Sequence, residues 1–441
     1  MAMIDGFALM AITGYSWAGI AAYPLAGPLL ALRAAKGKED RARRLERFGY
    51  PSVDRPHGPL VWIHAASVGE TLAVVGLMRE LRRRDINVLL TTGTVTSAEL
   101  VRLRLDGEII HQYVPLDLRP AVRRFLDYWG PDIAISVESE IWPTTLGELD
   151  RRHIPQILVN ARMSDRSFER WHRHNSIAEA LVSKLSLVIA QSDVDAERFR
   201  DLGAWPVAVS GNLKVDGDAP PCDTAVLARY REQIGHRKTW AAISTFEGEE
   251  KIAVMVHRAL KAHVGLLTIV VPRHPERCDE LEAMMVEKGL KVARRTRDDA
   301  ITPDTDIFLG DTIGEMGLYL RLTEIAFVGR SITGQGGQNP LEPAMLGCAV
   351  LSGPNVENFR DSYQQLVRNG NARIVRDAEM LAKAVHFLSV NDLARHKMID
   401  AGTETLQEMR GALVATIKGL EPYINPLTVK ARLEPRAARQ R

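Results

Sequence analysis

Short apolar runs alternate with amphipathic stretches from Leu60 onward. The run VWIHAA is followed by GETLAVVGLMRELRRR and then by INVLLTTGT. A buried strand, a helix with one apolar face and a second buried strand, in this order, predict a parallel sheet wrapped by helices. Further strands in this half of the chain are expected at residues 132–137, 155–159, 186–190 and 207–210.

A second set of apolar runs repeats this rhythm in the other half of the chain. It predicts strands at residues 239–244, 265–271, 307–309, 325–328 and 349–352. Between the two sets, the segment VDGDAPPCDT clusters Gly, Pro and Asp, as interdomain linkers do. The pattern therefore predicts two doubly wound, Rossmann-like α/β domains that face a central cleft, with ligands at the carboxyl ends of the strands.

The domain boundaries follow from these patterns, and the length of 441 residues agrees with two domains. The expected segments are a membrane anchor with a basic flank (1–50), an N-terminal domain (51–216), a linker (217–224), a C-terminal domain (225–424) and a basic tail (425–441). The tail lacks an apolar period, so it is expected to fray or to contact anionic lipid.

The N-terminal segment has the composition of a membrane anchor. Residues 6–32 form a run of 27 residues without a charge, and about 20 apolar residues suffice to cross a bilayer. Residues 33–50 carry seven basic and three acidic side chains, which favours a cytoplasmic location for this flank. Pro24 and Pro28 interrupt the run, so a spanning helix and a helix lying in the interface both remain open. A cleaved signal peptide would place positive charge before the run, where only Asp5 stands.

Composition narrows the classes of partner. The formal net charge of +2 provides no global field that would attract nucleic acid, so an anionic partner must be bound by local basic residues. Cys222, Cys278 and Cys348 are far apart and form no CxxC motif. This spacing argues against a disulfide framework and against a zinc site, and it fits a reducing compartment.

Acidic and basic side chains follow the predicted strands of the first half. Ser67 and Glu70 stand where a strand leads into a helix, and Ser-x-x-Glu is also a capping box, in which Glu70 only secures the first helical turn. Glu138 and Glu140 follow the strand at 132–137, and a period of two places both on the same side. Lys214 follows the strand at 207–210, where a cleft-floor position and an ordinary surface position are both possible.

The second half offers a comparable set of junctions. STFEGEE, at residues 244–250, has a capping-box pattern whose free N–H groups could hold a phosphate, and the fork of Arg273 suits a phosphate as well. A glycine-rich loop at residues 334–337 allows close backbone approach to a ligand, and it is followed by Glu342, which could accept both hydroxyls of a ribose. The acidic pair at residues 304 and 306 leads directly into a strand, which disfavours a metal site there.

Taken in order, these motifs resemble the 3-deoxy-D-manno-octulosonic acid (Kdo) transferase family of lipopolysaccharide synthesis. The likeness covers almost the whole chain and rests on HAASVGE, ESEIWP, NARMSDRS, QSD, GNLK, STFEGEE, VPRHPER, GDTIGEM and GGQNPLEPA. It implies a GT-B fold without catalytic metal or cofactor, CMP-Kdo as donor and lipid IVA as acceptor. It also implies a place on the cytoplasmic face of a bacterial inner membrane, in contact with membrane lipid and not with nucleic acid.

The resemblance also implies roles for individual residues. Glu70 would be the general base, and Glu138 and Lys214 would stabilise the transition state. CMP would be bound by nine residues: Pro272, Arg273, Gly314, Glu315, Met316, Asn339, Pro340, Leu341 and Glu342. A carboxylate base aimed at a sugar hydroxyl supplies roughly 10²- to 10⁴-fold, which agrees with the role implied for Glu70.

Three positions depart from the pattern of the family. Relatives typically have His where this chain has Phe246 and Gln338, and Gly where it has Arg330. These changes leave open a divergent transferase of another acidic sugar. A non-hydrolysing nucleotide-sugar epimerase and a membrane-bound scaffold without turnover would also fit the two-domain architecture. The charge-free N-terminal run argues against the epimerase, and the joint presence of Glu70, Glu138 and Lys214 argues against the scaffold.

Overall fold

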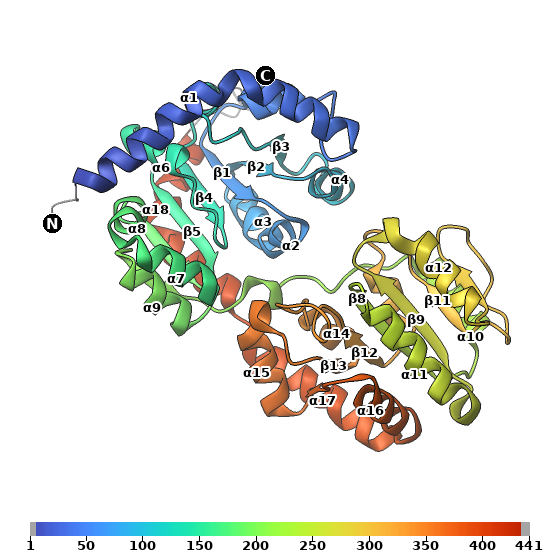
Figure 1. Cartoon of the computed structure of the whole chain (residues 1–441). Helices are drawn as coiled ribbons and strands as arrows, with labels where there is room; N and C mark the ends of the chain where they lie inside the picture. Colours follow the sequence, from blue (N-terminus) through green and yellow to red (C-terminus); the bar gives the residue numbers. More distant parts are fainter. Residues whose placement is uncertain (1–5, 434–441) are drawn as a thin grey trace. The chain divides into compact units, whose positions relative to one another are not determined.

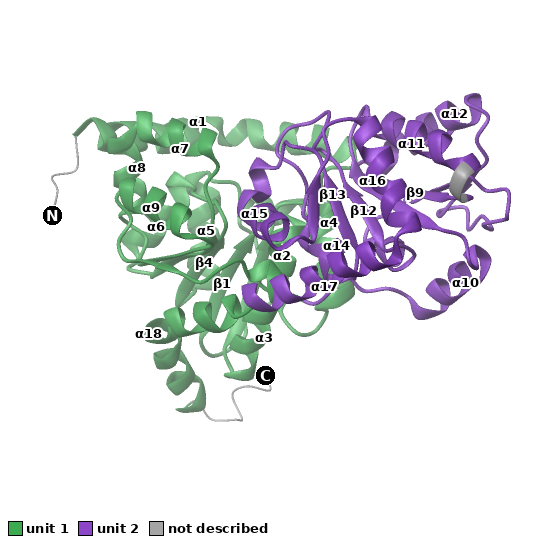
Figure 2. Ribbon diagram, turned by 90° about the horizontal axis from the view of Figure 1, so that it is seen from below, with its two compact units in different colours: residues 1–217, 410–441 green, residues 218–409 purple. Residues whose placement is uncertain are grey.

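The computed structural model of the chain describes residues 6–433, the side chains of residues 263 and 264 excepted. The chain divides into two compact units, each built on one parallel sheet (Figures 1 and 2). Unit 1 comprises residues 1–217 and 410–441, and unit 2 comprises residues 218–409. The predicted pair of doubly wound α/β domains is therefore confirmed.

The sheet of unit 1 has seven strands in the order β3-β2-β1-β4-β5-β6-β7. They are β1 (Leu60–Ala65), β2 (Asn87–Thr92), β3 (Ile110–Tyr113), β4 (Ile133–Val137), β5 (Gln156–Ala161), β6 (Leu187–Ala190) and β7 (Val207–Val209). The strand order reverses between β1 and β4, and such a topological switch point is where open α/β sheets bind ligands.

Helices cover both faces of this sheet (Figure 1). They are α1 (Gly6–Ala35), η1 (Arg44–Phe48), α2 (Val68–Ala73), α3 (Val75–Arg83), α4 (Val95–Arg104), α5 (Arg119–Trp129), α6 (Pro143–Arg151), α7 (Asp165–Arg173), α8 (Asn175–Val182), α9 (Asp193–Asp201), η2 (Leu213–Val215) and α18 (Ala412–Leu433). Strand β1 sends Ile63 into the core formed with α2, α3 and α18, and it sends Trp62 into the core formed with α5. Because both faces are buried, β1 reads as a continuous apolar run.

The sheet of unit 2 has the strand order β10-β11-β9-β8-β12-β13-β14. Its strands are β8 (Thr239–Thr245), β9 (Leu267–Pro272), β10 (Val292–Arg294), β11 (Ile307–Leu309), β12 (Ile325–Val328), β13 (Ala349–Ser352) and β14 (Ala372–Ile374). The order reverses between β8 and β12, which places the switch point of this sheet there. The five strands expected in this half are confirmed to within two residues, and the short strands β10 and β14 were not predicted.

The helices of unit 2 pack on both faces of its sheet. They are α10 (Thr224–Ile234), α11 (Glu249–Val264), η3 (Pro275–Arg277), α12 (Cys278–Glu287), α13 (Met316–Arg321), α14 (Leu341–Met345), η4 (Glu357–Phe359), α15 (Arg360–Asn369), α16 (Ala378–Val390) and α17 (Asp392–Met409). Trp240 packs in the core with α11, α12 and α16, and its indole N–H donates to Thr268 Oγ1 at 2.8 Å. Phe308 contacts Tyr230 and Tyr319, which lie on α10 and α13.

The C-terminal boundary differs from the expected one at residue 424. The chain returns to unit 1 at residue 410, and α18 contributes Ile424 and Leu427 to the core around β6. Asp216 secures the start of this segment, because its carboxylate accepts the N–H groups of Gly411 at 2.9 Å and Leu413 at 2.6 Å. The first residues of the expected basic tail are thus helical, and residues 434–441 lie outside the described part.

Helix α1 lies against unit 1 along much of its length. It contacts α5, α6 and α8, and the ring centroids of Tyr23 and Phe48 are 5.6 Å apart. A Cβ at Gly19 would lie 3.3 Å from Leu118 Cδ2, which shows how closely the helix approaches the domain. The other side of α1 exposes large apolar side chains: Phe7, Leu9, Met10, Tyr15, Trp17, Leu25, Leu29 and Leu32. Among the described residues, α1 is the one helix long and apolar enough to cross a membrane.

Part of the basic flank belongs to the interior of unit 1. Arg47 is buried and pairs with Glu39 at 3.1 Å, and Arg43 pairs with Glu46 at 2.8 Å. These two arginines fasten the segment after α1 to the domain, because Arg43 donates to the His111 carbonyl at 2.9 Å and Arg47 donates to the Gly93 carbonyl at 2.6 Å. The exposed basic side chains of the flank that can meet an anionic surface include Lys36, Lys38, Arg41 and Arg44.

Candidate functional site

Glu70 lies where β1 leads into α2. Ser67 is the N-cap of α2, and its Oγ accepts the N–H of Glu70 at 3.3 Å. The Glu70 carboxylate accepts the Ser67 hydroxyl at 2.7 Å and the Ala66 N–H at 2.7 Å. The predicted cap is therefore formed, with its return bond to Ala66. A carboxylate offers about four lone-pair positions, so these two bonds orient Glu70 and leave it able to accept a proton.

Glu138 forms an ion pair with a lysine that follows the edge strand β7. Its φ of 61° lies in the left-handed region, so β4 ends at Val137 and strand alternation does not continue. Strand alternation therefore does not relate Glu138 to Glu140, although the charges of both carboxylates raise the pKa of Glu70. Lys214, on η2 after β7, donates its ammonium to Glu138 Oε1 at 2.5 Å, and Arg162 Nε lies 3.9 Å from Oε2.

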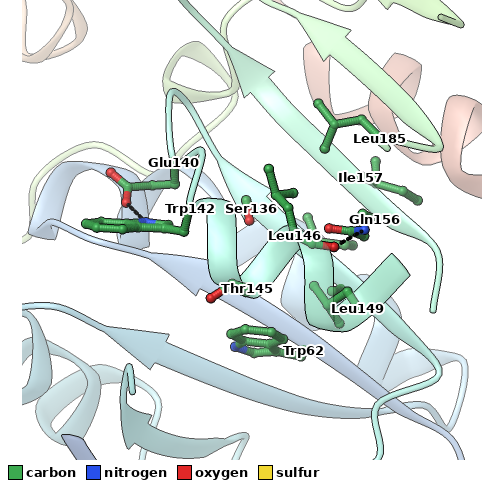
Figure 3. Close-up of a pocket in the computed structure, with 12 residues that line it drawn as sticks. Trp62, Ser136, Glu140, Trp142, Thr145, Leu146, Leu149, Gln156, Ile157 and Leu185 are labelled. Carbon is green, nitrogen blue, oxygen red and sulfur yellow. Dashed lines mark hydrogen bonds between the residues drawn. The ribbon is translucent and has the colours of Figure 1, made fainter. Parts of the chain in front are cut away.

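Glu140 has a different set of partners. Its carboxylate accepts the indole N–H of Trp142 at 2.6 Å (Figure 3). It also lies 3.6 Å from His64 Nε2. The cavity that Figure 3 draws beside it, between β4, β5 and α6, has about 20 Å³, room for about one water molecule. A sugar does not fit there, so we place the site at the sheet edge around Glu70.

The pKa values of Glu70 and Glu140 are shifted in opposite directions. Burial raises the pKa of Glu70 above its ordinary value, and the negative charge of Glu138 adds to this effect. Burial alone would raise the pKa of Glu140 too, but its contacts with His64 and Trp142 lower it overall. Lys214 stands close to the same helix terminus, since a Cβ at Gly69 would lie 4.0 Å from its Nζ. Glu70, Glu138 and Lys214 therefore form one cluster at the switch point of unit 1.

In unit 2, the residues implied in donor binding follow neighbouring strands. Pro272 and Arg273 stand at the end of β9. Residues 314–316 follow β11 and end at the first residue of α13, and residues 339–342 follow β12 and end in the first turn of α14. Because β11, β9, β8 and β12 are consecutive in the sheet, these segments meet at one edge. Arg273 is exposed, and its backbone N–H donates to the Thr245 carbonyl at 3.0 Å.

The acidic residues of this edge are already engaged. The Asn339 amide donates to Glu342 Oε1 at 3.3 Å, and its Oδ1 accepts the Leu341 N–H at 3.1 Å. Glu315 accepts a hydrogen bond from Arg295 at 2.8 Å. These bonds fix Glu342 and Glu315 at the starts of α14 and α13.

Glu249, part of the STFEGEE motif, has a structural role that the sequence analysis did not predict. Its buried carboxylate accepts four backbone N–H groups, from Phe246 at 3.0 Å, Arg330 at 2.6 Å, Ser331 at 2.8 Å and Ile332 at 3.0 Å. The predicted capping box at residues 244–250 is not formed, because Gly248 is the N-cap of α11 and Glu249 binds the loop after β12. Glu249 thereby positions the loop that carries Asn339 and Glu342.

The acidic pair before β11 makes ion pairs. Asp304 pairs with Lys291 at 2.8 Å, and buried Asp306 pairs with Lys261 at 2.6 Å and contacts His257 at 3.3 Å. Within residues 6–433, no group of three or more His, Cys, Asp or Glu side chains is arranged to hold a metal ion.

Comparison with known proteins identifies the family. The family model for 3-deoxy-D-manno-octulosonic-acid transferase (kdotransferase) matches residues 42–217. The chain is 34% identical over 412 residues to the 3-deoxy-D-manno-octulosonic acid transferase of Haemophilus influenzae, an alignment that covers 91% of this chain and 96% of that protein. The chain belongs to the Kdo transferase family. It is accordingly a glycosyltransferase, as the resemblance of its motifs implied.

Solved structures place the fold of this Kdo transferase in the GT-B class. A glycosyltransferase from Rickettsia africae matches with a TM-score of 0.57 at 13% identity, over 84% of this chain and 99% of that one. A UDP-GlcNAc 2-epimerase from Neisseria meningitidis matches with a TM-score of 0.57 at 13% identity, over 82% of this chain and 100% of that one. Because transferases and epimerases share this fold, the fold alone does not separate the two activities.

The predicted site residues of this Kdo transferase therefore fall into two clusters. One comprises Glu70, Glu138 and Lys214 at the switch point of unit 1, and the other lies at the carboxyl edge of the sheet in unit 2. The roles of these residues remain predictions.

Proposed function

We propose that this protein transfers Kdo from CMP-Kdo to lipid IVA in lipopolysaccharide synthesis, with Glu70 as the general base. The observation that carries the proposal is the Glu70 carboxylate, held at the switch point beside Glu138 and Lys214, with its pKa raised by burial and by the charge of Glu138. A carboxylate whose pKa moves toward the operating pH is a better proton acceptor for a hydroxyl.

The proposed reaction is a direct displacement. Glu70 accepts the proton of a lipid IVA hydroxyl while its oxygen attacks the anomeric carbon of Kdo, and the bond from that carbon to the CMP phosphate breaks. Attack on the face opposite to the leaving group inverts the anomeric centre. The Lys214 ammonium, held by Glu138, stabilises negative charge that develops beside Glu70.

The donor half of the proposal assigns CMP to unit 2. Arg273, residues 314–316 and residues 339–342 provide the binding surface at the carboxyl edge of the sheet. The leaving group, CMP, carries only one phosphate. Each well-aimed hydrogen-bond donor to the charge that develops on this phosphate contributes on the order of 3 kcal/mol. We therefore propose that the reaction uses no metal or other cofactor.

The test is transfer with defined substrates. The full chain in membranes is incubated with lipid IVA and freshly generated CMP-Kdo, and the lipid is analysed by mass spectrometry. Addition of one or more Kdo units is expected. If the donor stays intact and no Kdo is added, the proposed function is wrong, and a parallel incubation with another CMP-activated acidic sugar distinguishes a divergent transferase from a protein without turnover.

We further propose that α1 lies in the cytoplasmic interface of the inner membrane. Its contacts with α5, α6 and α8 occupy one side, while Phe7, Trp17 and Leu29 stand exposed on the other. This arrangement suits an in-plane anchor better than a free span. The exposed cations of the flank would meet anionic lipid head groups at the same surface.

Replacing Met10, Trp17 and Leu29 by Ser is expected to abolish flotation of the protein with vesicles that contain anionic lipid. The reason is that these exposed side chains, 69%, 62% and 58% accessible, supply the apolar area that enters the membrane. A matched variant with Ser at Leu103 and Leu393, which are 67% and 82% exposed on other helices, should still float. If both variants floated to the same extent, the proposal that α1 lies in the membrane interface would be wrong.

A further inference from the structure

Phe246 and Arg330 occupy the switch point of unit 2. Phe246 directly follows β8, and Arg330 stands two residues after β12. These strands are neighbours in the sheet, and the strand order reverses between them. In unit 1 the equivalent position holds Glu70 and Glu138. A doubly wound sheet binds its ligand at this position, so the side chains here face the ligand region of unit 2.

The two side chains contact each other. The guanidinium carbon of Arg330 lies 5.1 Å from the centroid of the Phe246 ring, within the range of a cation–π interaction. The same ring meets His274 edge-on, with centroids 5.4 Å apart and planes at 87°. Phe246 is therefore held between a residue after β9 and the guanidinium of Arg330, and it limits the positions that this guanidinium can take.

The backbone of Arg330 is fixed on both sides. Its N–H donates to Glu249 Oε2 at 2.6 Å, and its carbonyl accepts the Gly337 N–H at 3.1 Å. Its φ of 57° lies in the left-handed region, which an arginine adopts only at a cost in free energy. Such a conformation persists where the surrounding bonds impose it, and it occurs often at ligand sites.

The charge of Arg330 has no acidic partner in the described part of the chain. Neither its guanidinium nor that of Arg273 donates a hydrogen bond to a carboxylate among residues 6–433. Two buried acids lie at the start of α11: Glu249 is occupied by four N–H groups, and Glu250 pairs with Arg277 at 2.8 Å. Two uncompensated cations at one sheet edge create a local positive potential. A guanidinium matches the paired oxygens of a phosphate or carboxylate.

We propose that Arg330 binds an anionic group of the sugar-nucleotide donor through its guanidinium fork, with Phe246 as the positioning residue. The identity of the donor as CMP-Kdo rests on the function proposed above, whereas the recognition of an oxyanion rests on the geometry of unit 2. The donor carries two such groups, the phosphate and the sugar carboxylate, and the experiment below distinguishes them.

The test replaces Arg330 by Gly. Glycine adopts a positive φ without strain, so Arg330→Gly removes the cation while it relaxes the backbone, and the variant should remain folded. CMP and cytidine are the probes, with affinities measured by calorimetry on the full chain. Loss of charge-assisted hydrogen bonds should weaken CMP binding about 10- to 100-fold and leave cytidine binding unchanged. Arg258→Ala removes an exposed cation from the middle of α11 and should change neither affinity.

Three outcomes support the proposed role of Arg330 and one overturns it. Weaker CMP binding identifies the phosphate as the group that Arg330 binds. Unchanged CMP binding with a KM for CMP-Kdo raised about 10-fold or more identifies the sugar carboxylate. If both quantities are unchanged while wild-type protein transfers Kdo, the role of Arg330 is wrong and the proposed function stands. If wild-type protein does not transfer Kdo, but Arg330→Gly weakens binding of CMP or UMP, the proposed function fails and the role of Arg330 stands.

The role of Phe246 is tested by a double-mutant cycle with Arg330. Phe246→Leu should weaken CMP binding several-fold in the wild-type background and should have no further effect when Arg330 is already Gly. A ring that only stabilised the fold would weaken binding equally in both backgrounds, and that result would contradict a positioning role.

Discussion

Glu70→Gln is expected to lower the rate of Kdo transfer about 10²- to 10⁴-fold while the protein stays folded. The amide keeps the size of the side chain and can still accept the Ala66 N–H, so the cap of α2 is largely retained, but it cannot take a proton from a hydroxyl. Single-turnover transfer and the affinity for CMP are the two measurements, and CMP binding should be unchanged because the residues proposed to bind CMP lie in unit 2.

Ser67→Ala is the matched control, because it removes the capping hydroxyl and leaves the base. Loss of an N-cap costs about 1 kcal/mol of stability, so a lower Tm with nearly full activity is expected. If Ser67→Ala and Glu70→Gln lost the same activity, Glu70 would be a cap and not a base.

The pH dependence gives a second check on Glu70. Burial and the charge of Glu138 raise its pKa, so the acidic limb of kcat/KM should lie at higher pH than for an ordinary glutamate. Since ionisation is disfavoured in the folded state, the protonated form stabilises the fold at low pH, and this contribution is lost as pH rises through the raised pKa. Glu70→Gln removes the buried negative charge, so the loss of that charge should not lower the Tm of the variant at neutral pH.

Most of the predicted strands could be recognised because they are buried on both faces. Strand β1 is buried at every position and apolar at all of them except His64, and similar apolar runs marked β8 and β9. Strands β3, β10 and β14 escaped prediction because they stand at sheet edges, are only three or four residues long and mix polar with apolar positions.

Long-range contacts explain what the sequence could not indicate. Glu138 and Lys214 were both recognised as candidates, but their ion pair joins residues 76 positions apart. Helix α18 contains Pro422 and Pro426, so its helical pattern was weak, and only the packing of Ile424 and Leu427 reveals that it belongs to unit 1. Strand periodicity failed at Glu138 because a single left-handed residue ends β4.

Glu249 is a motif residue whose role in this structure is to hold a distant loop in place. In the sequence it is an acidic residue near a helix start, which suggested a cap or a phosphate site. In the structure its carboxylate reaches the N–H groups of Arg330, Ser331 and Ile332, more than 80 positions away, and links β8 to the loop after β12. The STFEGEE motif therefore shapes the loop that carries Asn339 and Glu342, the residues proposed to bind the donor.

Glu249→Gln is accordingly expected to destabilise unit 2 by about 2–6 kcal/mol. The amide can replace only one carboxylate oxygen as an acceptor, so its NH₂ group would face two N–H donors, and each buried donor left without a partner costs about 1–3 kcal/mol. For a domain of this size the unfolding transition of unit 2 should move down by about 5–20 °C in calorimetry.

Glu247→Gln is the control, because Glu247 is an exposed neighbour, and it should leave this transition in place. CMP affinity should fall together with stability in Glu249→Gln, since the loop that bears Asn339 and Glu342 loses its anchor, and an unchanged Tm with unchanged CMP affinity would show that Glu249 does not hold this loop.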